Sequence, residues 1–474
     1  MTFLPLAILL LLHIPFVFSS LPSLNGTCVT TLDISDSSSC SNTRTLWDII
    51  WSCAATLFSC TWTAIHPNVP GMAEGKFTVL SRRLGIMMIA LIAPEVMITW
   101  ATIQFISARG AAKAFNDTFG AQHNQARSDH PDIGDSTATL LSEFPSSDRR
   151  NSSHPSAPQV AGCDFRGWTV THGFFAWMGG FMLYFNGKPR ATLKPDELLS
   201  FVREGSVEMP VIMEADMEDR SKGDALSKGI AILQLAWFVL QLVARYVQNL
   251  PMTLLELDTF AVAALTSISY GFWWKKPKDV RRTHAVYWKA TASPPSELAY
   301  GKVDAIFSAE GWTYLLFSYI YPVLDLLGSG PFNSPRAVHS RRVPSLGGYD
   351  KVDVYYHQNM ILLIGCFSGA VFGAIHCLGW NVLFQEHAEQ ILWRTASLAI
   401  VSVPVSILLF CSYAISLNGS NDINGAITIL ALVASSFIYI VARVTLIVLI
   451  LTSFRSLPPG IYDTVAWTNF IPHL

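Results

Sequence analysis

The chain has 474 residues, of which 51% are hydrophobic and only 14% are Asp, Glu, Lys or Arg. Ordinary soluble domains contain roughly 25% of these charged residues, so this chain has too little polar surface to cover a soluble globule of its length. A net charge of −2 argues against a strongly basic face for nucleic acid. The composition therefore predicts a membrane protein with several spans, whose partner is the lipid bilayer.

The N-terminus predicts a cleaved signal peptide over residues 1–20. Residues 4–18 are apolar, and the small residues Ser19 and Ser20 follow them, which is the pattern of a hydrophobic core before a cleavage site. The usual positive residues are missing, so an uncleaved first membrane helix is the alternative. Both interpretations send the chain into the secretory pathway, to the plasma membrane or to an endomembrane.

The following segment, 21–45, is predicted to be luminal or extracellular. It contains Cys28 and Cys40, in a stretch without helical pattern. Neighbouring thiols usually pair in an oxidising lumen, so we expect a disulfide between these two cysteines. Asn25 begins a glycosylation sequon in the same segment.

Six apolar runs are long enough to cross a bilayer, because a core of about 30 Å needs roughly 20 apolar residues in a helix. They are Leu46–Ile65, Leu84–Ile106, Met252–Trp274, Met360–Phe384, Leu398–Leu417 and Ala426–Thr452. Three shorter runs are Trp168–Phe185, Ile230–Val247 and Trp312–Leu327. We therefore expect an all-α fold, a polytopic transmembrane helix bundle of seven to nine spans after the signal peptide.

These runs divide the chain into segments. After residue 45 they are two transmembrane helices (46–106), a mostly disordered loop (107–167), a span or interfacial helix (168–185), a cytosolic loop (186–228), a transmembrane hairpin (229–274), a basic loop with a marginal span at 312–327 (275–358), three transmembrane helices (359–452) and a tail (453–474). The loop 107–167 contains the sequons of Asn116 and Asn151, which suit a luminal loop.

Lysine and arginine residues in short loops indicate the orientation, since they favour the cytosolic side. The cluster Trp273-Trp274-Lys275-Lys276-Pro277-Lys278 is typical of an interfacial tryptophan belt that leads into the cytosol. Nine spans would then place Arg341 and Arg342 outside, against the rule. If Trp312–Leu327 only dips into the membrane, this basic loop becomes cytosolic.

Glu95 is the first candidate for a functional residue. It follows Pro94 in the middle of Leu84–Ile106, and helices broken at such positions recur at ion and substrate sites. A structural carboxyl group, hydrogen-bonded between helices, is the alternative. Arg443 lies deep in the last run and needs a carboxylate or carbonyl partner, and charge and depth alone suggest Glu95.

Asp258 and Glu256 lie near the start of Met252–Trp274. They point to different faces of the predicted helix, so a shared-proton pair of these two is not expected. Acidic residues near a helix N-terminus are favoured by its dipole, which makes a structural role the main interpretation.

Gly365, Gly369 and Gly373 form a GxxxGxxxG face. Such a face lets a second helix approach closely, within the chain or in a homo- or hetero-oligomer. His376 extends this face, and His172 lies in another run. Imidazoles on separate segments are weak evidence for metal, so we predict no metal site and no cofactor.

Several strings resemble a family of fungal multi-pass membrane proteins without an established activity. They are LWDIIWSC at 46–53, TWTAIHPNVP at 61–70, APE at 93–95, THGFFAWMGGF at 171–181, DRSKGD at 219–224, FWWKKP at 272–277, IHC at 375–377, LWR at 392–394 and LPPGIY at 457–462. The resemblance implies a polytopic membrane protein and supplies no catalytic residues. Lys278 departs from it, since a leucine is expected there.

Three classes of function are consistent with these features. A transporter, channel or receptor-like protein is the leading hypothesis, because ionisable residues lie deep in predicted spans. An embedded enzyme acting on a lipid is the first alternative, and a structural or assembly factor is the second. The ligand is not identified by the sequence.

Overall fold

The computed structural model describes residues 43–72, 74–128, 167–219, 224–295, 298, 341–350, 357–382, 384, 386–416, 422–455 and 457–465. The predicted signal peptide, Asn25, Cys28, Cys40, Asn151 and the run Trp312–Leu327 therefore lie outside the described residues. Within them the chain is mostly helical, with one small sheet.

The described α-helices are α2 (Leu46–Ala64), α3 (Lys76–Ile92), α4 (Pro94–Ser128), α5 (Val170–Trp177), α6 (Pro195–Arg203), α7 (Glu214–Asp219), α8 (Asp224–Val247), α9 (Leu254–Phe272), α13 (Gln358–Cys377), α14 (His387–Ser416) and α15 (Asp422–Ser453). Two 3-10 helices are η1 (Leu378–Asn381) and η2 (Pro459–Tyr462). The strands are β1 (Phe181–Phe185), β2 (Lys188–Thr192) and β3 (His284–Tyr287).

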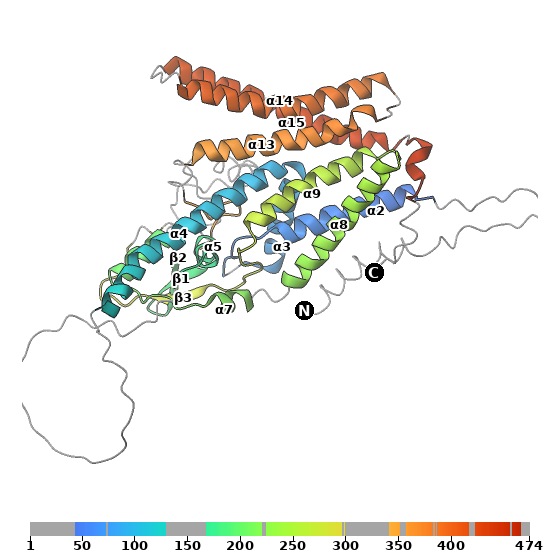
Figure 1. Ribbon diagram of the computed structural model, residues 1–474. Helices are drawn as coiled ribbons and strands as arrows, with labels where there is room; N and C mark the ends of the chain where they lie inside the picture. Colours follow the sequence, from blue (N-terminus) through green and yellow to red (C-terminus); the bar gives the residue numbers. More distant parts are fainter. Residues whose placement is uncertain are drawn as a thin grey trace, which may run out of the picture.

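The long helices form two layers. The C-terminal helices α13, α14 and α15 lie together across one side of the molecule, and α4, α9, α8 and α2 lie below them (Figure 1). Helix α13 joins the layers, because it packs against α14 on one side and against α4 and α9 on the other. The apolar core at this junction includes Ile98, Leu257, Phe372 and Trp393.

Four helical segments in the described part of the chain are long and apolar enough to cross a bilayer. They are Leu226–Val247, Asn359–Asn381, His387–Ser412 and Leu430–Ser453. The pair α3 and α4 also passes when taken together, but it is bent by 115°. A helical membrane protein is thus supported with four or five spans, and the predicted count of seven to nine is not confirmed.

The bend between α3 and α4 interrupts the run Leu84–Ile106, which the sequence predicted as one span containing Pro94. Helix α3 ends at Ile92, and Pro94 begins α4, because proline has no N–H to continue the helical pattern and clashes with the preceding turn. Helix α4 continues to Ser128, so residues 107–128 are helical where the sequence predicted disorder. Phe115 explains part of this, since its ring stacks on Trp168 with 3.6 Å between centroids.

The fold is mostly helical as expected, but the expectation of an all-α fold left out one small sheet, which begins in Trp168–Phe185, a run that is neither a span nor a single helix. Helix α5 ends at Trp177, and Gly179 follows with φ of +90°, a conformation that favours glycine. The chain then enters β1, which pairs with β2 in antiparallel and with β3 in parallel fashion. This sheet, in the order β2-β1-β3, has its own core with Phe175, Phe181 and Leu198.

The α8–α9 connection is a short turn, as its four-residue spacing predicts. Asn249 adopts φ of 53° there, and asparagine tolerates this left-handed conformation better than most residues. Arg245 closes the turn by donating from Nη2 to the carbonyl oxygen of Pro251 at 2.6 Å. Arg245 therefore has backbone partners and does not need to reach lipid headgroups.

Candidate functional site

Glu95 and Arg443 lie together inside the helix bundle. Nη2 of Arg443 is 3.9 Å from Oε2 of Glu95, and their side chains are 8% and 12% exposed. The hydroxyl of Tyr439 donates to Oε1 of Glu95 at 3.0 Å. We call these three residues the Glu95 cluster. It joins the first turn of α4 to the middle of α15.

The helix break positions this cluster. Val96 donates its backbone N–H to the carbonyl of Ala93, so the carbonyl of Ile92 is left outside the helical pattern. Arg443 donates to that Ile92 carbonyl, and its guanidinium lies over the ring of Phe372 at 3.7 Å. The break between α3 and α4 thus leaves free the acceptor that holds Arg443.

Two polar atoms of the Glu95 cluster have no hydrogen-bond partner. They are Oε2 of Glu95 and Nε of Arg443, and both are buried. Buried polar atoms without partners are rare and costly. The cluster therefore has unused capacity for one acceptor contact and one donor contact, which a proton, an ion or a polar solute can take.

His376 and Asp258 form a second polar contact beside α13. Nε2 of His376 lies 3.2 Å from Oδ1 of Asp258 in α9, and Nδ1 lies 2.8 Å from the carbonyl oxygen of Phe372. The His376 side chain is fully enclosed, whereas that of Asp258 is 22% exposed. The indole of Trp393 in α14 donates to the His376 carbonyl.

The glycine face of α13 packs against three helices of the same chain. A methyl group on Gly373 would meet the backbone nitrogen of Val401 at 2.8 Å, and one on Gly369 would meet Pro404 at 3.2 Å. One on Gly365 would meet Thr99 at 3.1 Å. This face is therefore occupied within the chain by α14, α15 and α4.

His172 has a local structural role. Its Nδ1 accepts the backbone N–H of Thr169 at 3.1 Å, and its Nε2 lies 2.9 Å from the carbonyl oxygen of Ile212. The first contact caps the start of α5, and the second ties α5 to the segment before α7. Asn116 is similarly engaged, because its carboxamide bonds both the N–H and the carbonyl of Trp168.

A third polar cluster was not predicted from the sequence. Lys276 is 2% exposed, and its Nζ donates to Oε1 of Gln104 at 2.8 Å and to Oδ1 of Asn68 at 3.2 Å. The rings of Trp100 and Trp273 lie 5.1 and 5.2 Å from the ammonium. Burial holds the pKa of Lys276 well below its usual range. We call these five residues the Lys276 cluster.

The Lys276 cluster corrects the predicted tryptophan belt. Trp273 is fully buried and donates from its indole to Oε1 of Gln104 at 2.9 Å, whereas Trp274 is 51% exposed. The chain turns at the end of α9, where Lys276 N–H bonds the Trp273 carbonyl, and this turn directs Lys276 inward. Trp274 and Lys275 thus lie at the surface, whereas Trp273 and residues 276–278 are buried.

The same cluster also contacts the basic loop. The Asn68 carboxamide donates to the carbonyls of Pro344 and Gly347 while its oxygen accepts from Lys276. Arg342 also lies 2.7 Å from Glu74 in the α2–α3 loop. Lys276 after α9 and the basic loop at 341–350 therefore both contact the α2–α3 loop.

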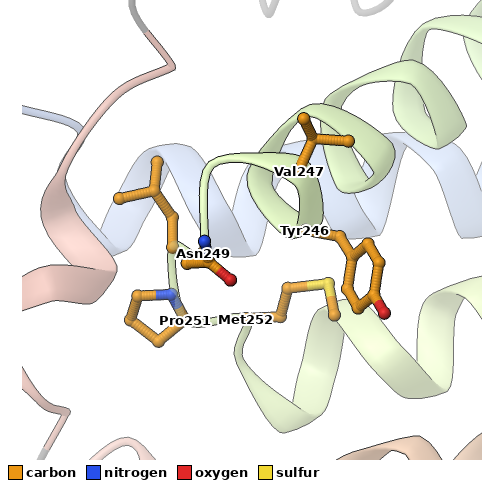
Figure 2. A pocket seen from close by; sticks show the side chains of 6 residues that line it. Tyr246, Val247, Asn249, Pro251 and Met252 are labelled. Carbon is orange, nitrogen blue, oxygen red and sulfur yellow. The ribbon is translucent and has the colours of Figure 1, made fainter.

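Figure 2 shows a surface hollow at the α8–α9 turn. It is lined by Tyr246, Val247, Asn249, Leu250, Pro251 and Met252. None of these six residues is charged, and Tyr246 and Val247 are 74% and 71% exposed. This open, uncharged surface lacks the convergent polar groups of a binding site.

A family model matches residues 18–294 and 327–474, and its description is a family of unknown function, DUF8562. The chain belongs to this family. No curated protein and no solved structure matches the chain. Family membership therefore brings no activity, and the argument for function depends on the geometry of the buried polar clusters. Among the described residues, no three His, Cys, Asp or Glu side chains are grouped to hold a metal ion.

Proposed function

We propose that the protein transports a solute or ion across its membrane and that the Glu95 cluster is the polar element of the pathway. One observation carries this proposal: Glu95 and Arg443 lie 3.9 Å apart at a break in an apolar helix pair. Ionisable groups at such depth are costly, and they commonly mark ion or substrate pathways. Broken helices direct their free backbone groups to the same kind of site.

The position of Glu95 suits a proton-coupled mechanism. It lies in the first turn of α4, and it accepts a hydrogen bond from Tyr439 while Oε2 has no hydrogen-bond partner. Protonation at Oε2 would weaken the attraction to Arg443 and release its guanidinium. A movement of α15 relative to the α3–α4 break is then the expected conformational response.

Proton flux into proteoliposomes tests this proposal. The purified full-length protein is reconstituted into liposomes that contain a pH-sensitive dye. A membrane potential is then imposed, and a mixture of sugars, amino acids and nucleobases is added outside. The wild type and the exposed control Glu386→Gln should acidify the lumen, and Glu95→Gln should not. Equal flux from all three variants, or none from folded wild type, would contradict the proposal.

The two alternatives have their own measurements. Turnover of radiolabelled phospholipid or sterol by the purified protein would favour an embedded enzyme. A stable complex after crosslinking in membranes, without flux or turnover, would favour a structural or assembly factor. A receptor-like protein would bind a solute in these liposomes without transferring it.

We further propose a location in a membrane of the secretory pathway, with the N-terminal segment luminal. The support is the apolar run at residues 4–18 and the nearby cysteines Cys28 and Cys40, which would pair in an oxidising lumen. Peptide mapping without reduction should find these two cysteines linked, and glycosidase treatment should lower the apparent mass if Asn25 or Asn151 is modified. Two free thiols at these positions would contradict a luminal segment.

A further inference from the structure

The contact between Asp258 and His376 supports an inference that does not depend on transport. The two residues come from α9 and α13, and the imidazole is completely enclosed while one edge of the carboxyl is accessible. Their polar atoms Nε2 and Oδ1 are 3.2 Å apart. The positions of the hydrogen atoms on the His376 ring follow from its second contact, between Nδ1 and the carbonyl oxygen of Phe372.

Nδ1 of His376 must carry a hydrogen. It lies 2.8 Å from the carbonyl oxygen of Phe372, and a carbonyl oxygen can only accept. A neutral imidazole with hydrogen on Nδ1 has a lone pair on Nε2. His172 is the opposite case, because a backbone N–H points at its Nδ1 and its hydrogen is therefore on Nε2.

One further proton is then required between Nε2 and Oδ1. An ionised carboxylate only accepts, so it cannot bond the lone pair of a neutral His376 ring. The contact at 3.2 Å needs either an imidazolium facing a carboxylate or an imidazole facing a carboxylic acid. In both forms the pair contains the same number of protons, so the additional proton is shared by the two residues.

We propose that Asp258 and His376 form a proton-binding site that holds α9 against α13. When the shared proton leaves, two acceptors face each other at Nε2 and Oδ1. If the ring moves its hydrogen to Nε2 instead, the lone pair on Nδ1 faces the Phe372 carbonyl. The first outcome breaks the contact between α9 and α13, and the second breaks the bond between His376 and Phe372 within α13, so a rise in pH removes one buried hydrogen bond in either case.

The surrounding charged groups are engaged elsewhere. Glu256 of α9 pairs with Arg44, Arg394 of α14 donates to the Trp380 carbonyl, and Arg443 of α15 lies beside Glu95. His387 and Glu389 lie in the first turn of α14. Asp258 is the charged side chain that contacts His376. The ring of Phe372 also lies under Arg443, so the proton site and the Glu95 cluster share this residue.

Solid-state NMR on the full-length protein in lipid bilayers tests the site directly. With nitrogen-15 in the histidines, the His376 signals are identified by their loss in His376→Gln. We expect Nδ1 to keep its hydrogen at acidic pH and Nε2 to change with pH. In Asp258→Asn the introduced amide can donate to Nε2, so this titration should disappear. A hydrogen on Nε2 alone at every pH would overturn the proposal.

Thermal unfolding provides a second measurement. The midpoint of the wild type, relative to that of Asp258→Asn, should fall as pH rises through the titration seen by NMR. The exposed control His387→Gln should keep the wild-type profile. A constant difference between wild type and Asp258→Asn at all pH values would show a plain structural hydrogen bond. Neither measurement uses transport, so failure here is distinct from failure of the proposed function.

Discussion

Nζ of Lys276 lies 2.8 Å from Oε1 of Gln104, and Lys276 is only 2% exposed. The same Gln104 oxygen accepts the indole N–H of Trp273, and the Gln104 amide donates to the carbonyl of Gly347. One glutamine thus connects α4 to the end of α9 and to the 341–350 loop. If the Gln104 side chain were removed, the ammonium of Lys276 and the indole N–H of Trp273 would both lose an acceptor.

Replacing Lys276 by methionine should destabilise the protein. The substitution leaves acceptor atoms of Gln104 and Asn68 buried without this donor, which costs about 1–3 kcal/mol. The exposed neighbour Lys275→Met should change the free energy of unfolding by less than about 0.5 kcal/mol. Chemical unfolding in detergent measures both values, and equal effects would contradict the buried placement of Lys276.

The lowered pKa of Lys276 also predicts a pH dependence. Below its folded-state pKa, lysine is protonated in both states and the folded state bears the full cost of burial. Between that pKa and the usual value of 10.5, the unfolded state binds more protons, so stability should rise with pH. Lys276→Met should remove this rise. A rise of the same size in Lys276→Met would assign it to another group.

Substitutions at Glu95 should separate its shape from its charge. Glu95→Gln retains an acceptor for Tyr439, so the free energy of unfolding should change little. Glu95→Leu removes the Tyr439 contact and leaves Arg443 without its carboxylate, and it should cost about 1–3 kcal/mol. Denaturant titration of the two proteins tests this order, and equal stabilities would place the carboxyl in a polar, hydrated setting.

Gly373→Ala should be strongly destabilising because its methyl group would lie 2.8 Å from the backbone nitrogen of Val401. Overpacking of this kind costs about 1–3 kcal/mol. Gly271→Ala is the matched control, because that helical glycine has no neighbouring atom within 4 Å of the added carbon. Folded yield and thermal midpoint should fall only for Gly373→Ala. Equal loss from both would refute close packing of α13 on α14.

Arg44→Met should destabilise the junction between the start of α2 and the α8–α9 turn. Arg44 pairs with Glu256 at 2.5 Å, and Glu256 also accepts the backbone N–H of Thr253. Leaving this enclosed carboxylate without Arg44 should cost about 3–5 kcal/mol. The exposed Arg109→Met provides the control for loss of a surface charge. If calorimetry gives both variants the wild-type midpoint, the pair of Arg44 and Glu256 does not stabilise this junction.

The Glu95 cluster shows which features of the site local sequence information predicts and which it does not. Pro94 predicted a break, because the chemistry of proline is independent of its surroundings. The depth of Arg443 predicted a need for a partner, and Glu95 was suggested on charge and depth alone. The Tyr439 contact and the Ile92 carbonyl depend on how α15 crosses α4, which no local pattern specifies.

Composition and apolar run length by themselves determined that this is a helical chain with segments able to cross a membrane, because charge content and hydrophobicity are summed along the sequence. Tertiary structure decided the direction of individual side chains. Lys276 and Lys275 are adjacent and chemically identical, yet the turn after α9 buries one and exposes the other. Likewise, Phe181–Phe185 became a strand that pairs with β2, which follows it after Asn186 and Gly187, and with β3, which supplies backbone partners from a distant position. The pairing with β3 depends on contacts between remote residues, and hydrophobic patterns within one segment do not encode it.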